Sequence, residues 1–290
     1  MSRLKLSRYR RVVDLAFGMA ARLFALLVAA VACCIVLFLV VGALPAIRTL
    51  GAGALFKARW SPSTEQYGML AMLACSACAC LSAVALALPV ALLGAACAKN
   101  FIPHGVTLFF RQLGVVLSGL PAVIFGLLGL TVLMPRLVLM MPEKMAKSGG
   151  ATLFTTIIML SAMLLPTLFV SCLDELVHVG NRVDEASCAL GATVLQTVFC
   201  AQLPAMKNRL YKVGMSGIAR ALCESMAVLL VSGNVVRMPA LFSSVRLLAP
   251  GMVLEMGYAS GIHRAALFGI GLVLLAVALL FESAIRWLDS

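Results

Sequence analysis

Long runs of uncharged, apolar residues constrain this chain more than any other feature of its sequence. A run of about 20 such residues crosses the hydrocarbon core of a bilayer as a helix. The chain is 63% hydrophobic and only 12% charged, which excludes a large water-soluble domain. The sequence therefore predicts an all-α membrane protein with several spans.

Six apolar stretches are predicted to cross the membrane. They are 23–44, 69–98, 112–134, 151–173, 213–236 and 265–281. Pro89 and Pro166 lie inside the second and fourth, which membrane helices tolerate where neighbours compensate the lost backbone bond. The third is interrupted at 118–121. A partly apolar stretch, 247–256, is expected to hold a short re-entrant or interfacial helix.

The distribution of basic residues predicts the topology. Six spans place both termini on one side, and lysine and arginine number 13 on that side against 9 on the other. Six of them precede the first span, within residues 1–22. Basic segments stay in the cytoplasm, so both termini and the long connection at 174–212 are expected there. The outer loops carry only three acidic residues, Glu65, Glu143 and Glu255, and their net positive charge would attract anions.

The formal net charge of +12 does not by itself indicate a nucleic-acid-binding protein. In a membrane protein a basic excess reports topology and contact with lipid headgroups. No basic run is interleaved with aromatic residues, so binding of nucleic acid is not expected.

A polar stretch at 184–204, the knob, separates the fourth and fifth apolar runs (DEASCALGATVLQTVFCAQLP). Gly191 can adopt a positive φ and end a first short helix. A second short helix is expected from Thr193 to Cys200, with Pro204 stopping it. This predicts a helix-turn-helix unit with a surface of small residues, which suits docking into a groove on another protein. The alternative is a loop that folds back onto the lipid surface.

The spacing within the knob resembles the ATPase-docking sequence of ABC-importer permeases. In those proteins Glu-Ala-Ala is followed after three residues by Gly, and after nine more by an aliphatic residue, any residue and Leu-Pro. The matching positions in this chain are Glu185, Ala186, Ser187, Gly191, Leu203 and Pro204. Ser187 replaces the second Ala, and Ala201 replaces the aliphatic residue. The resemblance implies that these six residues dock on a separate ATPase subunit.

Three further stretches resemble the phosphate-specific permeases, and within them the PstC-type subunit. Residues 119–130 (GLPAVIFGLLGL) are similar to Pro-Ser-Val-Val-Tyr-Gly-Leu-x-Gly-Leu, and residues 219–228 (ARALCESMAV) to Gly-Arg-Ala-x-Gly-Glu-Thr-Met-Ala-Val. Residues 232–234 (SGN) are similar to the Ile-Gly-Asn that follows. Cys223 and Ser225 depart from the family's Gly and Thr. The resemblance implies six transmembrane helices in a type I ABC importer permease fold.

This fold divides the chain into three parts. Residues 1–68 would hold the basic tail, the first transmembrane helix and the first periplasmic loop. Residues 69–283 would form the core permease domain, with five transmembrane helices and cytoplasmic coupling helices at about 183–204. Residues 284–290 would be a short cytoplasmic tail.

Two ionisable residues lie inside the predicted fifth span. Arg220 and Glu224 are four residues apart, so within one helix they share a face. An ionisable residue inside a span is a functional candidate, and the planar fork of arginine matches phosphate oxygens. We predict that Arg220 serves the substrate pathway and that Glu224 positions or gates it, as the resemblance also implies. A structural ion pair between subunits, or snorkelling toward the interface, is the alternative.

The sequence contains no catalytic constellation, because it lacks a Walker A lysine and a Gly-x-Ser-x-Gly motif. Cys75, Cys78 and Cys80 lie in an apolar run without histidine and are expected to be packing residues. The histidines each flank a span and are expected at the membrane interface: His104, His178 and His263. We expect no enzyme activity, no metal and no bound cofactor, and no disulfide framework.

The resemblance implies a membrane-spanning subunit of an ATP-driven importer that moves inorganic phosphate across the bacterial cytoplasmic (inner) membrane by alternating access. The implied partners are ATPase subunits that use ATP and Mg²⁺, a second permease subunit of the PstA type, a periplasmic or lipid-anchored phosphate-binding protein, and membrane lipid. Another oxyanion or small solute is the alternative substrate. An intramembrane enzyme or a stand-alone channel is the alternative class, and neither needs a knob that docks on an ATPase.

Overall fold

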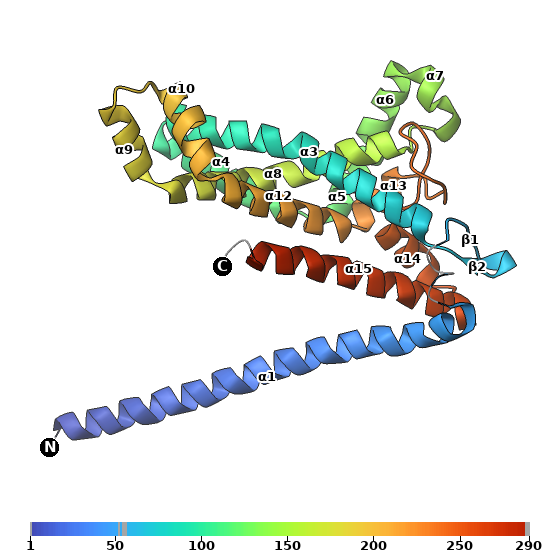
Figure 1. Ribbon diagram of the computed structural model, residues 1–290, viewed down its shortest axis with the longest axis horizontal. Helices are drawn as coiled ribbons and strands as arrows, with labels where there is room; N and C mark the ends of the chain where they lie inside the picture. Colours follow the sequence, from blue (N-terminus) through green and yellow to red (C-terminus); the bar gives the residue numbers. More distant parts are fainter. Residues whose placement is uncertain (1, 52, 54–56, 288–290) are drawn as a thin grey trace.

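The computed structural model describes residues 2–51, 53 and 57–287, and the chain is a bundle of helices (Figure 1). The centre of the bundle is formed by α3 (Leu70–Phe101) and α8 (Leu153–Val179). On α3, buried alanines recur every four residues from Ala79 to Ala95. Small residues let helices in a membrane approach closely, and here they receive the buried leucines of α8, such as Leu164.

The first helix, α1 (Ser2–Leu50), is longer than the sequence indicated. A basic tail at 1–22 and a loop starting at Pro45 were predicted, but one helix runs through both, with Pro45 inside it. Proline removes a single backbone bond, which a membrane helix tolerates. Toward its C-terminal end α1 packs on α15 (Gly261–Trp287), and its N-terminal part diverges from the bundle (Figure 1).

Two of the predicted spans are divided into shorter helices. The third consists of α4 (His104–Ser118), an interruption at 119–121, and α5 (Ala122–Leu128). A π turn, η2 (Gly129–Leu133), continues α5 into α6 (Met134–Met140). The predicted interruption before Pro121 is confirmed, since proline cannot donate the backbone bond that would continue α4.

The fifth predicted span, 213–236, is not one helix. It is divided between α12 (Lys207–Leu222) and the short α13 (Met226–Val231). Within the described residues, five helices are long and apolar enough to cross a membrane. These five are Phe17–Leu50, Leu70–Phe101, Ala122–Met140, Leu153–Val179 and Gly261–Trp287. The fifth predicted span is absent from them because neither of its two helices is both long and apolar enough.

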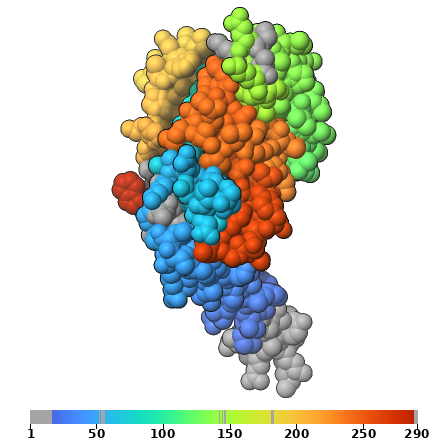
Figure 2. All heavy atoms as spheres, turned by 90° about the vertical axis from the view of Figure 1, so that its right-hand side faces the viewer, coloured from blue at the N-terminus to red at the C-terminus, as the bar shows by residue number. Residues whose placement is uncertain are grey.

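The two ends of the bundle differ in structure. At the knob end lie α9 (Asn181–Ala189), α10 (Val194–Gln196), the π turn η4 (Thr197–Gln202) and α11 (Leu203–Ala205). At the opposite end, the hairpin end, β1 (Trp60–Ser61), η1 (Pro62–Thr64) and β2 (Gln66–Tyr67) form an antiparallel hairpin. Figure 2 looks onto this end, where the hairpin lies beside the C-terminal segments of the chain.

Three short helices complete the described fold. A turn of helix and a 3-10 turn, α7 (Pro142–Met145) and η3 (Ala146–Ser148), connect α6 to α8. The short helix predicted in the last long loop is confirmed as α14 (Leu248–Met256), which packs on the start of α15. The N-terminal end of α1 and the C-terminal end of α15 both point toward the knob end (Figure 1).

Candidate functional site

Arg220 lies where two interrupted helices meet. It is half-buried in the last turn of α12, and its Nη2 donates a hydrogen bond of 2.9 Å to the carbonyl oxygen of Ser118, the last residue of α4. The guanidinium therefore sits at the negative end of the α4 dipole. Beyond the interruptions α5 packs closely on α13, since a Cβ on Gly126 would lie only 2.9 Å from the Cα of Ala227.

Glu224 does not share a helix face with Arg220, so that prediction is wrong. The spacing of four residues brings side chains together only within a continuous helix. Here α12 ends at Leu222, and Glu224 lies in the interruption before α13, half-buried. Within the described part of the chain no ion pair joins the two side chains. The arginine uses one of its five N–H donors on Ser118, and the others are available to an anion.

The turn of the knob has the geometry that its sequence predicts. Gly191 has φ +80°, as expected for a residue that ends a helix. Its N–H donates to the carbonyl of Cys188 and that of Ala192 donates to the carbonyl of Ser187, which together form a Schellman motif. Thr193 then caps the next helix through a capping box with Gln196.

The second helix of the knob is longer than predicted. It was expected to end near Cys200, with Pro204 as its stop, but it continues to Ala205 through the π turn η4. Pro204 lies just after the π turn, at the start of α11. It does not stop the helix, which ends one residue later at Ala205. The change of direction into α12 occurs at Met206.

The remaining predicted residues divide into an exposed and a half-buried set. Glu185, Ala186, Gly191 and Pro204 are exposed, whereas Ser187 and Leu203 are half-buried. The hydroxyl of Ser187 lies 2.9 Å from that of Thr197 and so joins the two helices of the knob. Large apolar side chains are also exposed on this surface, namely Leu190 (89% exposed), Val194, Leu195 and Phe199. Exposed apolar surface of this kind marks a contact with another protein or with lipid.

A buried polar network, missed at the level of sequence, fastens the knob to the bundle. Gln202 is fully buried (0% exposed). Its Nε2 donates to Asn100 Oδ1 (3.0 Å) and to Asp184 Oδ1 (2.6 Å). Lys99 pairs with the other oxygen of Asp184 (3.0 Å) and donates to the carbonyl of Leu176. The knob is therefore tied to the ends of both central helices, α3 and α8. The signal in the sequence is a lone glutamine within an apolar run.

Two further ion pairs tie α8 to its neighbours at the knob end. Arg111 of α4 contacts Asp174 (2.8 Å), and Arg209 of α12 contacts Glu175 (2.7 Å). Both pairs are partly exposed. Asp174 and Glu175, which are adjacent on α8, thus hold α4 and α12 against this central helix.

A second polar centre, also missed, lies at the hairpin end. Glu255 on α14 is buried (4% exposed), and its carboxylate is the centre of several contacts. It accepts hydrogen bonds from Trp60 Nε1 (2.9 Å) and from Arg246, and it lies 2.7 Å from His263 Nε2. The ring of His263, which the sequence predicts at the membrane interface, stacks on Tyr67. Burial raises the pKa of the Tyr67 phenol, with smaller contributions from Glu65 and Glu255.

The described residues form no group of three or more histidine, cysteine or acidic side chains that is arranged to hold a metal ion. The ten cysteines, all within the described part of the chain, are free thiols. The chemistry available to the site is thus that of positive charge and hydrogen-bond donors, centred on Arg220.

The chain is similar over most of its length to ABC transporter permeases. The probable ABC transporter permease protein YqgH of Bacillus subtilis is 31% identical, over 99% of this chain and 95% of that protein. The phosphate transport system permease protein PstC of Haemophilus influenzae is 28% identical, over 91% and 89%. PstC of Pasteurella multocida is 26% identical, over 96% and 92%. No protein-family profile matches the chain.

Proposed function

The chain belongs to the PstC-type family of ABC transporter permeases, and on that premise we propose that it is the membrane-spanning subunit of an ATP-driven importer of inorganic phosphate. Two relatives are named as phosphate transport permeases, which supports the substrate. A half-buried arginine between interrupted helices supports an anionic cargo. The proposed location is a bacterial cytoplasmic (inner) membrane, with both termini and the knob in the cytoplasm.

The knob is proposed to dock in a groove of an ATPase subunit, which binds ATP and Mg²⁺. Exposed apolar side chains such as Leu190 and Phe199 offer a contact surface. The observation that carries the coupling proposal is the buried Gln202, because a displaced knob would pull on α3 and α8 with it. Closure of two ATPases would then switch the pathway between outward and inward states by a rigid-body movement.

In this proposal α12 and α13 together form the sixth membrane crossing of a type I importer fold. Transporters place the broken ends of interrupted helices at their substrate sites. Arg220 would contact the passing phosphate through the donors that Ser118 leaves unused. Glu224, in the adjoining interruption, would position or gate that contact.

The pathway requires further subunits. A second permease of the PstA type would supply its other half, and a periplasmic or lipid-anchored phosphate-binding protein would deliver the anion. Such a binding protein would set the specificity, so the pathway itself needs only weak binding. Another oxyanion or small solute is the alternative substrate, because the name of the Bacillus relative specifies no substrate.

The pathway role is tested by neutralising Arg220 in the assembled transporter and measuring phosphate uptake. Arg220→Gln should stop uptake while insertion and assembly persist, and Arg220→Lys, which keeps the charge but not the fork, should be intermediate. Arg209→Gln on the same helix is the matched control. It removes one partly exposed arginine and should leave uptake largely unchanged.

The double variant Arg220→Gln with Glu224→Gln separates the two interpretations. If the residues are only a structural ion pair, removing both charges restores function, since the cost lies in one buried charge left alone. If Arg220 serves the anion, the double variant remains inactive. Within the described part of the chain Arg220 and Glu224 form no ion pair, which favours an inactive double variant. Recovered phosphate uptake in the double variant would refute the pathway role of Arg220.

A further inference from the structure

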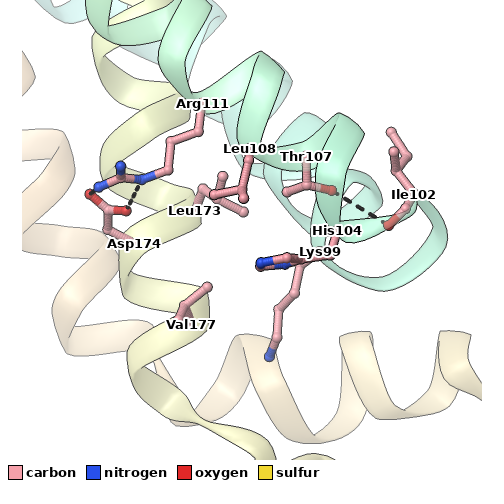
Figure 3. A pocket seen from close by; sticks show the side chains of 9 residues that line it. All are labelled: Lys99, Ile102, His104, Thr107, Leu108, Arg111, Leu173, Asp174 and Val177. Atoms are coloured by element: carbon pink, nitrogen blue, oxygen red, sulfur yellow. Dashed lines mark hydrogen bonds and ion pairs between the residues drawn. The ribbon is translucent and has the colours of Figure 1, made fainter.

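A pocket of about 380 Å³ opens at the knob end, between the start of α4 and the last turns of α8 (Figure 3). One side of it is apolar and is lined by Leu108, Leu173 and Val177. Leu108 and Val177 are exposed, as are Phe101 and Phe109, the sequence neighbours of the lining residues Ile102 and Leu108. In a chain that spans a membrane, exposed apolar side chains of this kind face acyl chains, so the mouth of the pocket is positioned at the edge of the lipid.

The other side of the pocket carries hydrogen-bond donors with positive charge. Arg111 holds Asp174 in a fork, with Nε–Oδ1 at 2.8 Å and Nη2–Oδ2 at 3.3 Å. Two of the five guanidinium donors are used in this way, and three are left. Because the pair is about half-exposed, the remaining donors are open to a ligand from solvent or lipid.

Across the pocket from Arg111 lie Lys99 and His104 (Figure 3). Lys99 uses two of its three N–H donors, on Asp184 and on the carbonyl of Leu176. The ring of His104 makes no hydrogen bond or ion pair within the described chain. Each of the two cations of the lining is thus paired with one carboxylate, Asp174 or Asp184, and keeps further N–H donors, while the imidazole of His104 has no partner within the described chain.

We propose that this pocket binds the phosphate ester of an anionic phospholipid, with the acyl chains lying along the apolar side. A guanidinium fork and an ammonium group match phosphate oxygens. Basic pockets between membrane helices recognise anionic headgroups by the same combination of charge and apolar wall. Since Lys99 also anchors the knob through Asp184, an occupied pocket would stabilise that anchor. The inference concerns lipid binding and does not depend on the transported substrate.

The full-length chain, purified in a mild detergent, provides the test. Native mass spectrometry would count bound phosphatidylglycerol and phosphatidylcholine of equal chain length. Phosphatidylglycerol should be retained in preference. Arg111→Gln should weaken its binding about tenfold, as expected for the loss of a charge-assisted contact. Arg209→Gln removes an arginine with a similar exposure and a similar partner outside the pocket, and should have no effect.

His104→Ala provides a second variant, because an exposed ring without a partner contributes little to folding. It should weaken retention measurably while the melting temperature stays unchanged. Adding excess inorganic phosphate distinguishes a lipid headgroup from free phosphate as the natural ligand. If the pocket recognises the headgroup, the bound phosphatidylglycerol is retained, whereas a pocket built for free phosphate loses the lipid to the added anion. Equal retention of the two lipids, or equal losses in Arg111→Gln and Arg209→Gln, would overturn the proposal.

Discussion

The two ends of the bundle use charge in opposite ways. At the hairpin end a single buried carboxylate, Glu255, collects Trp60, Arg246 and His263 from three separate segments. At the knob end the charges are spread over separate pairs, each joining two helices. The pair of Arg209 and Glu175, for example, is 42% and 28% exposed.

This difference in burial indicates which end of the bundle is the more rigid. A buried charge that loses its partner is strongly destabilising, so the contacts of Glu255 must all persist together. Ion pairs in contact with water are screened and contribute little, so they break and form again at low cost. The hairpin end is therefore the rigid one. At the knob end the exposed pairs let α4 and α12 shift relative to α8, whereas the knob itself stays tied to α3 and α8 through the buried Gln202 and moves together with them.

The largest effect is expected from removing the charge of Glu255. Glu255→Gln leaves Arg246, whose side chain is 15% exposed, without its counter-charge. We expect a loss of roughly 3–5 kcal/mol in the free energy of unfolding. Thermal unfolding of the purified protein would measure it.

Glu175→Gln is the matched control for that experiment, since it removes one carboxylate from an ion pair at the knob end. We expect it to cost roughly 0–1 kcal/mol because water already screens the pair. Similar losses in the two variants would show that the ends do not differ as described.

A smaller and more local effect is expected from the anchor of the knob. Gln202→Leu removes the hydrogen bonds to Asn100 and Asp184 and leaves these polar groups half-satisfied. The expected cost is about 1–3 kcal/mol. Hydrogen exchange should become faster in α9 and stay unchanged in α14. Faster exchange at both ends would contradict a separate anchor.

The turn of the knob should respond less in stability but clearly in function. Gly191→Val forces a β-branched residue into φ +80°, at a cost of roughly 1–2 kcal/mol, although nothing lies within 4 Å of the new Cβ. The transporter should still assemble, but ATP hydrolysis should no longer drive uptake. Gly191→Asn is the control, since asparagine tolerates this conformation. Full uptake by Gly191→Val would count against docking through this turn.

The sequence could predict the features that depend on neighbouring residues. Gly191 and Thr193 mark the turn of the knob by their own chemistry, and Pro121 marks the end of α4. The interruption before α13 contains no proline or glycine, so nothing local revealed that Glu224 lies outside a helix. The polar centres were missed for a different reason.

Those centres join residues that are far apart in the chain. Trp60 and Glu255 are separated by 195 positions, and Asn100 and Gln202 by 102. A single sequence contains no signal that pairs such distant residues. Each of them was therefore assigned only to its own segment, Glu255 to an outer loop and Gln202 to the knob, after its predicted second helix.

The smallest effect is expected within the knob itself. Ser187→Ala removes the hydrogen bond to the hydroxyl of Thr197. Thr197 is buried, so water does not replace the lost partner. A threonine hydroxyl in a helix can turn to the carbonyl one turn earlier, so the lost bond is replaced locally. We therefore expect a cost of at most about 1 kcal/mol, visible as slightly faster hydrogen exchange in α9 and α10. The substitution also restores the second alanine of the Glu-Ala-Ala sequence found in ABC-importer permeases. ATP hydrolysis should therefore still drive uptake. A loss as large as that of Gln202→Leu would mean that the knob is held by its internal bond rather than by its anchor on α3 and α8.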